Sequence, residues 1–250
     1  MKEQSGVQSV ERAFTVLELL CKNGNMGLTA LSAAAGLHKS TVYRLLSTLC
    51  NLGYVSKNSS TDEYFVTLKF LKISSSIMAK NDIRKSVKPF LERLSRITGE
   101  TAHLVERSGN DIIYIDKFES TENSVRMVSR IGLSLPMVYT AVGKAIMSCL
   151  NDKEIYNIWH STEITPKTDK TITDFGIFTA EIERVRALGY AVDDEENETG
   201  VKCIGAAIPD VYGNYRYAFS VSAPISRMTD EKTRLIAKSV IETKNEIMNV

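Results

Sequence analysis

The segment "GLHKSTVYRLLSTL" at residues 36–49 constrains the fold of this chain more than any other, because its apolar residues recur at helical spacing. At 100° per residue these residues form a stripe about 120° wide on one face, a spacing that a strand cannot use. The segment is therefore expected to be an amphipathic helix that packs this stripe against neighbouring elements. The stripe consists of Val42, Leu45, Leu46, Leu49 and Leu52.

The opposite face of this helix carries hydroxyl groups, an aromatic ring and cations, and no acidic residue occurs between Lys39 and Asn51. A solvated helix face usually mixes acids and bases, whereas hydroxyl and cationic donors suit the phosphates and base edges of DNA. Periodicity alone leaves both interpretations open. The candidate DNA-contacting residues of this helix are Lys39, Ser40, Thr41, Tyr43 and Arg44.

Two predicted helices precede this segment. Residues 9–21, "SVERAFTVLELLC", predict a helix with Ser9 as its N-cap. Residues 29–36, "TALSAAAG", predict a second, shorter helix ended by Gly36, which can adopt the positive φ of a tight turn. The segment at residues 36–49 then becomes the second helix of a helix-turn-helix. The core face expected for the first helix comprises Val10, Ala13, Phe14, Leu17, Leu20 and Cys21.

A predicted hairpin follows. Residues 54–57 and 64–68 indicate two short strands around a tip of Asn, Ser, Thr and Asp, which is the pattern of a wing. Three helices and a wing make a winged helix-turn-helix, in which the third helix enters the major groove and the wing touches the backbone. Arg12 and the wing are expected to hold phosphates. This order of elements favours the DNA-binding interpretation of residues 36–49.

Charge is divided unevenly along the chain. Residues 1–88 carry 12 basic and 6 acidic side chains, whereas the remaining residues carry 19 and 24, although the net charge is only +1. A basic N-terminal part followed by an acidic remainder indicates two parts with different functions, although a plain solvated helix could also account for part of the excess of basic residues. The apolar runs are far shorter than the roughly 18 residues of a membrane span, and the N-terminus lacks the apolar core of a signal peptide. A cytoplasmic protein with no membrane partner is expected.

The cysteines do not indicate a metal site. Cys21, Cys50, Cys149 and Cys203 lie far apart with no C-x-x-C pair, and only three histidines could join them as ligands. Neither a zinc cluster nor disulfides are predicted, and no cofactor is expected. For all but Cys203, reduced and mostly buried thiols are the favoured interpretation.

The rest of the chain predicts an α+β sensor domain. Residues 69–98 read as helix with a break near residues 80–82, and Pro89 is expected to kink or restart it. A hairpin turning at residues 108–110 and a third strand at residues 124–132 are expected next. The following stretches alternate between helix and strand, and mostly antiparallel strands with a similar total length of helix favour a ligand-binding domain.

Several motifs in the same order resemble the IclR-type bacterial transcription regulators. They include "VQSVERAFTVLELL", "LHKSTVYRLLSTL", "LGYV", "TAVGKA", "GYAVDDEENETGVKCIGAAIPD" and "SVSAPISR", which span nearly the whole chain. The resemblance implies a winged helix-turn-helix at residues 1–68, a linker helix at 69–82 and a GAF-like effector-binding domain at 83–250. It also implies a homodimer or homotetramer that binds a near-palindromic operator and a small carboxylate effector.

The resemblance implies an effector site at six positions of this sequence. Ser220 and Ser222 are two residues apart on an expected strand and therefore share a face, and amides at a helix start favour an anion. Asp193 would have to accept ligand hydroxyls, since its charge would repel a carboxylate. Ordinary alternatives remain for each position, namely a polar sheet face, a solvated turn or core. The six effector-binding candidates are Ala141, Val142, Asp193, Cys203, Ser220 and Ser222, with Arg126 and Arg130 as weaker ones.

Within the family, "KSTVYR", "TLKF", "RMVSRIG" and "TAVGK" are most similar to regulators of pectin and hexuronate catabolism that respond to 2-keto-3-deoxygluconate. The chain departs from the usual family pattern at Gly205 and Ala207, and at Val138 and Tyr139. These departures bear on which effector is bound more than on the fold.

Two other classes of function compete with the regulator. A sensor that acts through protein contacts without DNA is disfavoured by the helix at residues 36–52. An enzyme is disfavoured because "VGKA" lacks the glycine and the Ser or Thr of a phosphate loop. A nucleophilic Cys203 would need a base that no motif supplies. No catalytic residue is therefore predicted.

Overall fold

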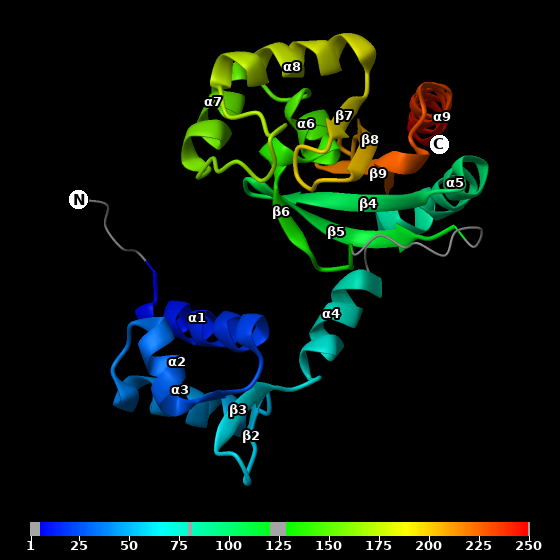
Figure 1. Ribbon diagram of the computed structural model, residues 1–250. Coiled ribbons are helices and arrows are strands. Elements are labelled where there is room, and N and C mark those ends of the chain that lie inside the picture. Colours follow the sequence, from blue (N-terminus) through cyan, green and yellow to red (C-terminus); the bar gives the residue numbers. More distant parts are fainter. Residues whose placement is uncertain (1–5, 80–81, 121–128, 250) are drawn as a thin grey trace. The chain divides into compact units, whose positions relative to one another are not determined.

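The computed structural model describes residues 6–79, 82–120 and 129–249, shown as ribbons in Figure 1. The chain divides into two compact units, residues 1–81 and 82–250, and each unit is described by itself. In the described part of the chain, no helix combines the length and the apolar character needed to cross a membrane.

The first unit is a winged helix. Its short sheet has the order β1-β3-β2, and Gly36 ends the second helix with a φ of 61°. The strand β1, which the sequence did not indicate, pairs Met26 with Tyr64 of the wing. A further helix, α4 (Phe70–Ala79), follows the wing. The other elements are α1 (Gln8–Asn23), β1 (Met26–Gly27), α2 (Leu28–Ala35), α3 (Lys39–Asn51), β2 (Val55–Lys57) and β3 (Glu63–Val66).

The apolar stripe of α3 packs largely as expected. Val42 and Leu46 are fully buried and Leu49 is nearly so, and they contact Leu20 and Leu31 from the two preceding helices in one core. Leu45 is half-buried at the edge of this core. Leu52, which follows the last helical residue, is instead exposed.

The core face expected for α1 was partly wrong. Leu17 and Leu20 are buried, but Val10 and Phe14 are 52% and 57% exposed, and Cys21 is exposed as well. The buried face is rotated around the helix and includes Val16, which the expected face left out. The predicted cap was also wrong, because α1 begins at Gln8 and no side chain caps it.

The second unit is built on an antiparallel sheet with the strand order β6-β5-β4-β9-β8-β7. This mixed architecture confirms the predicted α+β class. The strand β9, which comes last in the sequence, therefore lies between β4 and β8, near the centre of the sheet. Its strands are β4 (Thr101–Ser108), β5 (Asp111–Phe118), β6 (Ser134–Pro136), β7 (Ala191–Asp194), β8 (Val201–Ile208) and β9 (Tyr217–Pro224).

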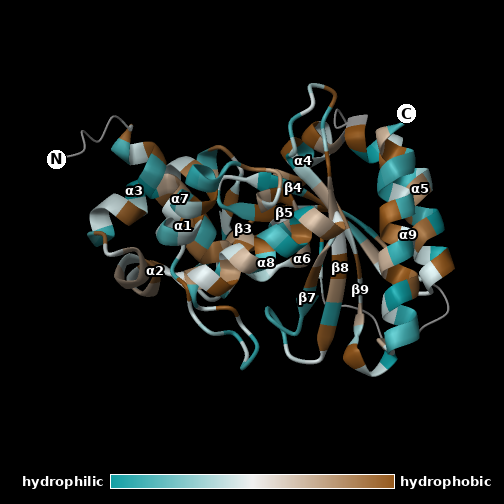
Figure 2. Cartoon of the chain, turned by 90° about the horizontal axis from the view of Figure 1, so that it is seen from above, coloured by the Kyte–Doolittle hydropathy of each residue, from teal (hydrophilic) through white to brown (hydrophobic). Residues whose placement is uncertain are grey.

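Helices cover both faces of this sheet. Figure 2 shows α5 and α9 together on one face, with α6 and α8 on the other. Side chains along β9 point alternately to the two faces of the sheet. Phe219 and Val221 belong to the core between the sheet and α5 and α9, while Ala218 belongs to the core between the sheet and α6. The helices are α5 (Asp82–Thr98), α6 (Ala141–Met147), α7 (Asp152–Ser161), α8 (Phe175–Leu188) and α9 (Asp230–Met248).

Part of each of two local expectations was wrong. Pro89 does not restart α5, because Val87 and Leu91 on either side of it both remain buried in one continuous apolar face. The strand expected at residues 124–132 lies mostly outside the described residues, and residues 129–132 are loop and turn. The strand that pairs with β5 is β6, further along the chain.

The four cysteines are free, and the expectation of mostly buried thiols fails for two of them. Cys21 and Cys149 are exposed, because each lies on the outward side of its segment, while Cys50 and Cys203 are half-buried.

Candidate functional site

The outer face of α3 presents the side chains predicted to read DNA. Lys39, Ser40, Tyr43 and Arg44 are exposed, and Thr41 is half-buried. Tyr43 is 56% exposed, a large area for an aromatic ring. The polar side chains therefore stand on a rigid helix whose opposite face is fixed in the core.

Arg12 of α1 lies close to this face. A hollow between α1 and α3 is lined by Arg12, Thr41 and Arg44, among other residues. Within the described part of the chain, no carboxylate forms an ion pair with Arg12, Lys39 or Arg44, so their charges are available to an external anion. Five of the six DNA-binding candidates are exposed or line this hollow on α3, and the sixth joins them from α1.

The wing has a structured tip. Lys57 and Asp62 form an exposed ion pair of 2.6 Å, and the Oδ1 atom of Asn58 accepts a hydrogen bond of 2.9 Å from the amide of Ser60. Asp62 adopts a φ of 59°, which closes the turn. These local bonds fix the tip, while Val55 and Tyr64 in the strands of the hairpin are buried in the core of the first unit.

A cavity of about 220 Å³ lies in the second unit between the sheet and the start of α6. All six effector-binding candidates line it, so the structure brings together residues that lie up to 81 positions apart. Asp193, Cys203 and Ser222 are direct cross-strand neighbours on β7, β8 and β9. Ser220 lies two residues before Ser222 on β9, on the same face of the sheet, and pairs with Gly205 of β8.

The start of α6 forms the wall opposite the sheet. The hydroxyl of Thr140 caps the helix by accepting a hydrogen bond of 3.0 Å from the amide of Gly143. In the described residues no protein acceptor faces the amides of Ala141 and Val142, which precede this cap contact in the first turn. These two amides are the groups that would meet an anion.

Two glycines allow this wall to approach the sheet. A Cβ atom on Gly143 would lie 2.1 Å from the carbonyl oxygen of Met137, so any larger residue would displace the helix. A Cβ atom on Gly205 would lie 2.9 Å from the oxygen of Phe219 and 3.2 Å from Val142. Gly205, one of the departures from the family pattern, therefore helps to set the distance between α6 and β8.

Asp193 is buried in the cavity wall at 4% exposure. Its Oδ1 atom accepts hydrogen bonds of 2.8 Å and 3.3 Å from the amides of Glu196 and Asn197. Burial, and next the nearby charge of Glu196, raise the pKa of Asp193 to about 7. Near neutral pH this carboxyl group can therefore accept a hydrogen bond or, when protonated, donate one.

The thiol of Cys203 is not set up as a nucleophile. Burial, reinforced by the charge of Asp193, raises its pKa, so the group remains a protonated thiol. Cys203 therefore contributes a weakly polar, uncharged surface to the cavity.

Sequence reasoning missed several residues of this cavity, including His103, Tyr114 and Ser129. Only strand alternation could have pointed to His103, since it lies on β4 opposite Ser220. Of the weaker candidates, Arg130 is exposed and is not part of the cavity lining, and Arg126 lies outside the described residues.

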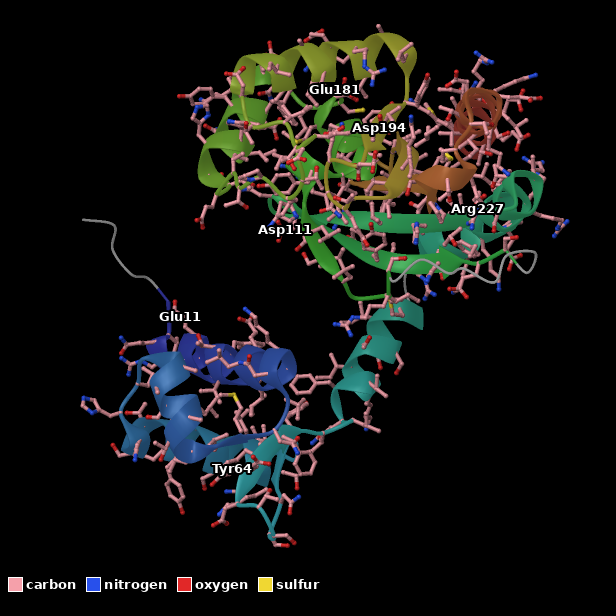
Figure 3. The ribbon with its side chains drawn as sticks, viewed as in Figure 1. Glu11, Tyr64, Asp111, Glu181, Asp194 and Arg227 are labelled. Carbon is pink, nitrogen blue, oxygen red and sulfur yellow. The ribbon has the colours of Figure 1, made fainter. Side chains whose placement is uncertain are left out.

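An ion-pair network centred on the buried side chain of Lys144 was also missed. The ammonium of Lys144 on α6 is fully buried, 2.5 Å from Oε1 of Glu196 and 3.5 Å from Oε1 of Glu181. Arg184 forms a second ion pair with Glu181 at 2.7 Å. Figure 3 labels Glu181 on α8, while Glu196 lies in the turn that follows β7, two residues beyond the labelled Asp194.

Two family models match the chain. The IclR helix-turn-helix domain matches residues 9–59, and the bacterial transcriptional regulator IclR C-terminal domain matches residues 75–249. The second match alone covers more than half of the chain and includes the whole cavity wall.

Several characterised proteins are similar over most of their length. The HTH-type transcriptional regulator KdgR of Escherichia coli is 34% identical over 92% of this chain and 88% of its own. The DNA-binding transcriptional repressor YiaJ of Escherichia coli is 35% identical over 98% and 88%. The crystal structure of the Thermotoga maritima IclR has a TM-score of 0.73 at 31% identity, covering 97% of this chain and 98% of that one.

Proposed function

Since the chain belongs to the IclR family of bacterial transcriptional regulators, we propose that it is a repressor whose affinity for DNA depends on a small carboxylate effector. The repressor acts as a homodimer or homotetramer on a near-palindromic operator. The observation that carries the proposal is the cavity at the start of α6, where all six effector candidates meet. Relatives named as repressors support repression rather than activation.

The proposed DNA interface is the outer face of α3, assisted by Arg12 and the wing. Lys39, Ser40, Thr41, Tyr43 and Arg44 enter the major groove of each half-site, and Arg12 holds a phosphate. Two copies double the number of contacts. Because cations such as Arg12 and Lys39 would neutralise phosphates and release counterions, most of the binding is electrostatic and falls steeply as salt rises.

The proposed effector is a sugar-derived acid such as 2-keto-3-deoxygluconate. Its carboxylate would meet the amides of Ala141 and Val142 and the hydroxyl of Ser222, while Ser220 and Asp193 would meet its other oxygen functions. The polar lining of the cavity and the likeness to regulators that respond to this compound support the assignment. Effector binding changes DNA affinity only if the two conformations of the repressor bind the effector differently.

Replacing Arg44 with Ala is expected to weaken operator binding by about 1 to 3 kcal/mol and to relax specificity at one base pair, if the guanidinium reads a guanine. Arg44→Lys keeps the charge but loses the bidentate geometry, so it should retain only the part of the binding free energy that does not depend on the DNA sequence. Binding to the operator and to single-base variants, measured by fluorescence anisotropy at fixed salt, separates the two effects.

The matched control is Lys22→Ala, which removes an exposed cation in the last turn of α1. Its operator affinity should change little. Equal weakening of Arg44→Ala on every sequence tested would make Arg44 a phosphate contact and remove it from the base-reading set.

The double variant Ser220→Ala with Ser222→Ala is expected to lose the thermal stabilisation given by the effector, because both hydroxyls line one cavity. The titration uses 2-keto-3-deoxygluconate, pyruvate and glyoxylate on the parent and the variant, with stability followed by differential scanning fluorimetry. If none of the three acids stabilises the parent protein, the effector assignment is wrong.

A further inference from the structure

His103 lies in the cavity lining with both ring nitrogens engaged by serine hydroxyls. It is 1% exposed, its Nε2 atom is 2.6 Å from the Oγ of Ser129, and its Nδ1 atom is 3.3 Å from the Oγ of Ser222. The ring also packs edge-on against Tyr114 at a centroid distance of 5.2 Å. The imidazole is thus fixed in place between two hydroxyls that both line the cavity, that of Ser222 on β9 and that of Ser129 in the segment before β6.

This imidazole is neutral. Burial, together with the nearby ammonium of Lys117, lowers the pKa of His103 to about 3. A neutral ring carries one hydrogen, so one nitrogen donates and the other accepts. The two nitrogens face hydroxyls that can themselves either donate or accept, and therefore two complete arrangements exist.

In the first arrangement the hydrogen is on Nε2, which donates to Ser129. Nδ1 then accepts the hydroxyl hydrogen of Ser222, so Ser222 offers only lone pairs to the cavity and the free hydroxyl hydrogen is that of Ser129. In the second arrangement the hydrogen is on Nδ1, which donates to the oxygen of Ser222. The hydroxyl hydrogen of Ser222 is then free to point into the cavity, and Ser129 donates to Nε2.

This choice matters because the cavity has few charged donors. Among the described residues that line it there is no Lys and no Arg, while Asp193 and Glu198 are acids. An anionic ligand must therefore be held by amides and hydroxyl hydrogens. A Ser222 that only accepts would repel a carboxylate oxygen, whereas a Ser222 that donates would bind it.

We infer that His103 is the positioning residue that sets the hydrogen-bond direction of Ser222, and that an anionic effector selects the ring with its hydrogen on Nδ1. The same selection makes Ser129 a donor to the ring, so occupancy of the cavity reaches the segment that precedes β6. This inference rests on the proposed function, because it takes the cavity as the effector site.

The direct test is the nitrogen-15 spectrum of the ring in the full-length protein. The chain has three histidines, so the His103 signals are assigned by their absence from a His103→Asn variant. Two-bond proton–nitrogen spectra distinguish the two neutral forms. Saturation with pyruvate, or with 2-keto-3-deoxygluconate, should give the form with the hydrogen on Nδ1. A bound protein with the hydrogen on Nε2, or with a doubly protonated ring, would overturn the inference.

Variants give an independent measurement. His103→Phe keeps the ring volume but removes both nitrogens, and should weaken pyruvate binding by about tenfold to a hundredfold. His103→Asn keeps a donor near the position of Nδ1 and should stay within about threefold of the parent. The neutral analogue pyruvamide should discriminate much less between these variants, so the ratio of acid to amide affinity reports hydrogen-bond direction rather than packing.

The outcomes separate the two proposals. If no acid binds the parent protein, the effector assignment falls, and this inference falls with it. If the acids bind but the acid-to-amide ratio is unchanged in His103→Phe, His103 does not position Ser222 and only this inference fails. Operator binding without effector, together with thermal stability, verifies that each variant is folded.

Discussion

Replacing Asp193 with Asn is expected to stabilise the folded protein by about 2 to 4 kcal/mol at pH 8. The carboxyl group has an ordinary pKa near 3.8 and a pKa of about 7 in the folded protein, because it is buried and lies close to the charge of Glu196. Ionised Asp193 therefore costs stability at pH 8. Asn removes the charge but keeps an oxygen that can accept the two amide hydrogen bonds now made by Oδ1.

The direction in which stability changes with pH follows from the raised pKa. Since the pKa is higher in the folded state, the parent protein loses stability as the pH rises from about 4 to about 7, and the Asn variant does not. Urea unfolding at pH 5 and pH 8 should show a gain that is at most about half as large at pH 5. The matched control is Asp194→Asn, whose carboxylate is 44% exposed and pairs with Lys202. An equal gain at both pH values would contradict a buried, titrating Asp193.

The stabilised variant should also respond less to the effector. Asp193 lines the cavity, and its protonation state decides whether it offers a donor or an acceptor there. A position that destabilises the fold at neutral pH and yet faces a ligand cavity is what a trade-off between stability and function predicts. The effector titration on Asp193→Asn measures this loss directly.

Replacing Lys144 with Met is expected to destabilise the protein by about 3 to 5 kcal/mol, the usual cost of leaving a buried charge without its partner. The ammonium is fully buried between Glu196 and Glu181. One oxygen of Glu196, Oε2, already lacks a hydrogen-bond partner among the described residues. Removal of the ammonium would leave the other oxygen of Glu196 unpaired as well.

A second substitution tests this explanation. Glu196→Gln in the Lys144→Met background removes the stranded charge and should restore a large part of the lost free energy of unfolding. Lys88→Met is the matched control, since Lys88 forms an exposed ion pair with Glu92 and its loss should cost less than about 1 kcal/mol. If Glu196→Gln gives no recovery, packing of the lysine stem rather than its charge is the main contribution.

Periodicity was sufficient for most of the fold. The apolar stripe of α3 and the two strands of the wing depend on residues close together in the chain, and the structure has both. The α+β class and the winged helix were predicted for the same reason. The core face of α1 was partly wrong because periodicity gives a stripe but not its rotation, which depends on contacts with α2 and α3.

The candidate site was predictable only with help from the family resemblance. The motifs named six positions, but spacing alone did not bring Ser222 to Cys203 or Asp193, since strand order decides that. His103 and Lys144 could not be predicted, because the partners of each come from distant segments. The hydrogen bond between His103 and Ser222 spans 119 residues, and the ion pair between Lys144 and Glu196 spans 52.

The place of β9 between β4 and β8 has a consequence for synthesis on the ribosome. The winged helix emerges first and can fold before the second unit is complete, since domains generally fold as units from the N-terminus. Until Tyr217–Pro224 emerges, the sheet consists of two separate halves, each with an open edge that invites pairing with another chain. On the proposed function, a chain cut short before Tyr217 would carry the helix-turn-helix domain but would lack Ser220 and Ser222, so its DNA binding could not respond to an effector.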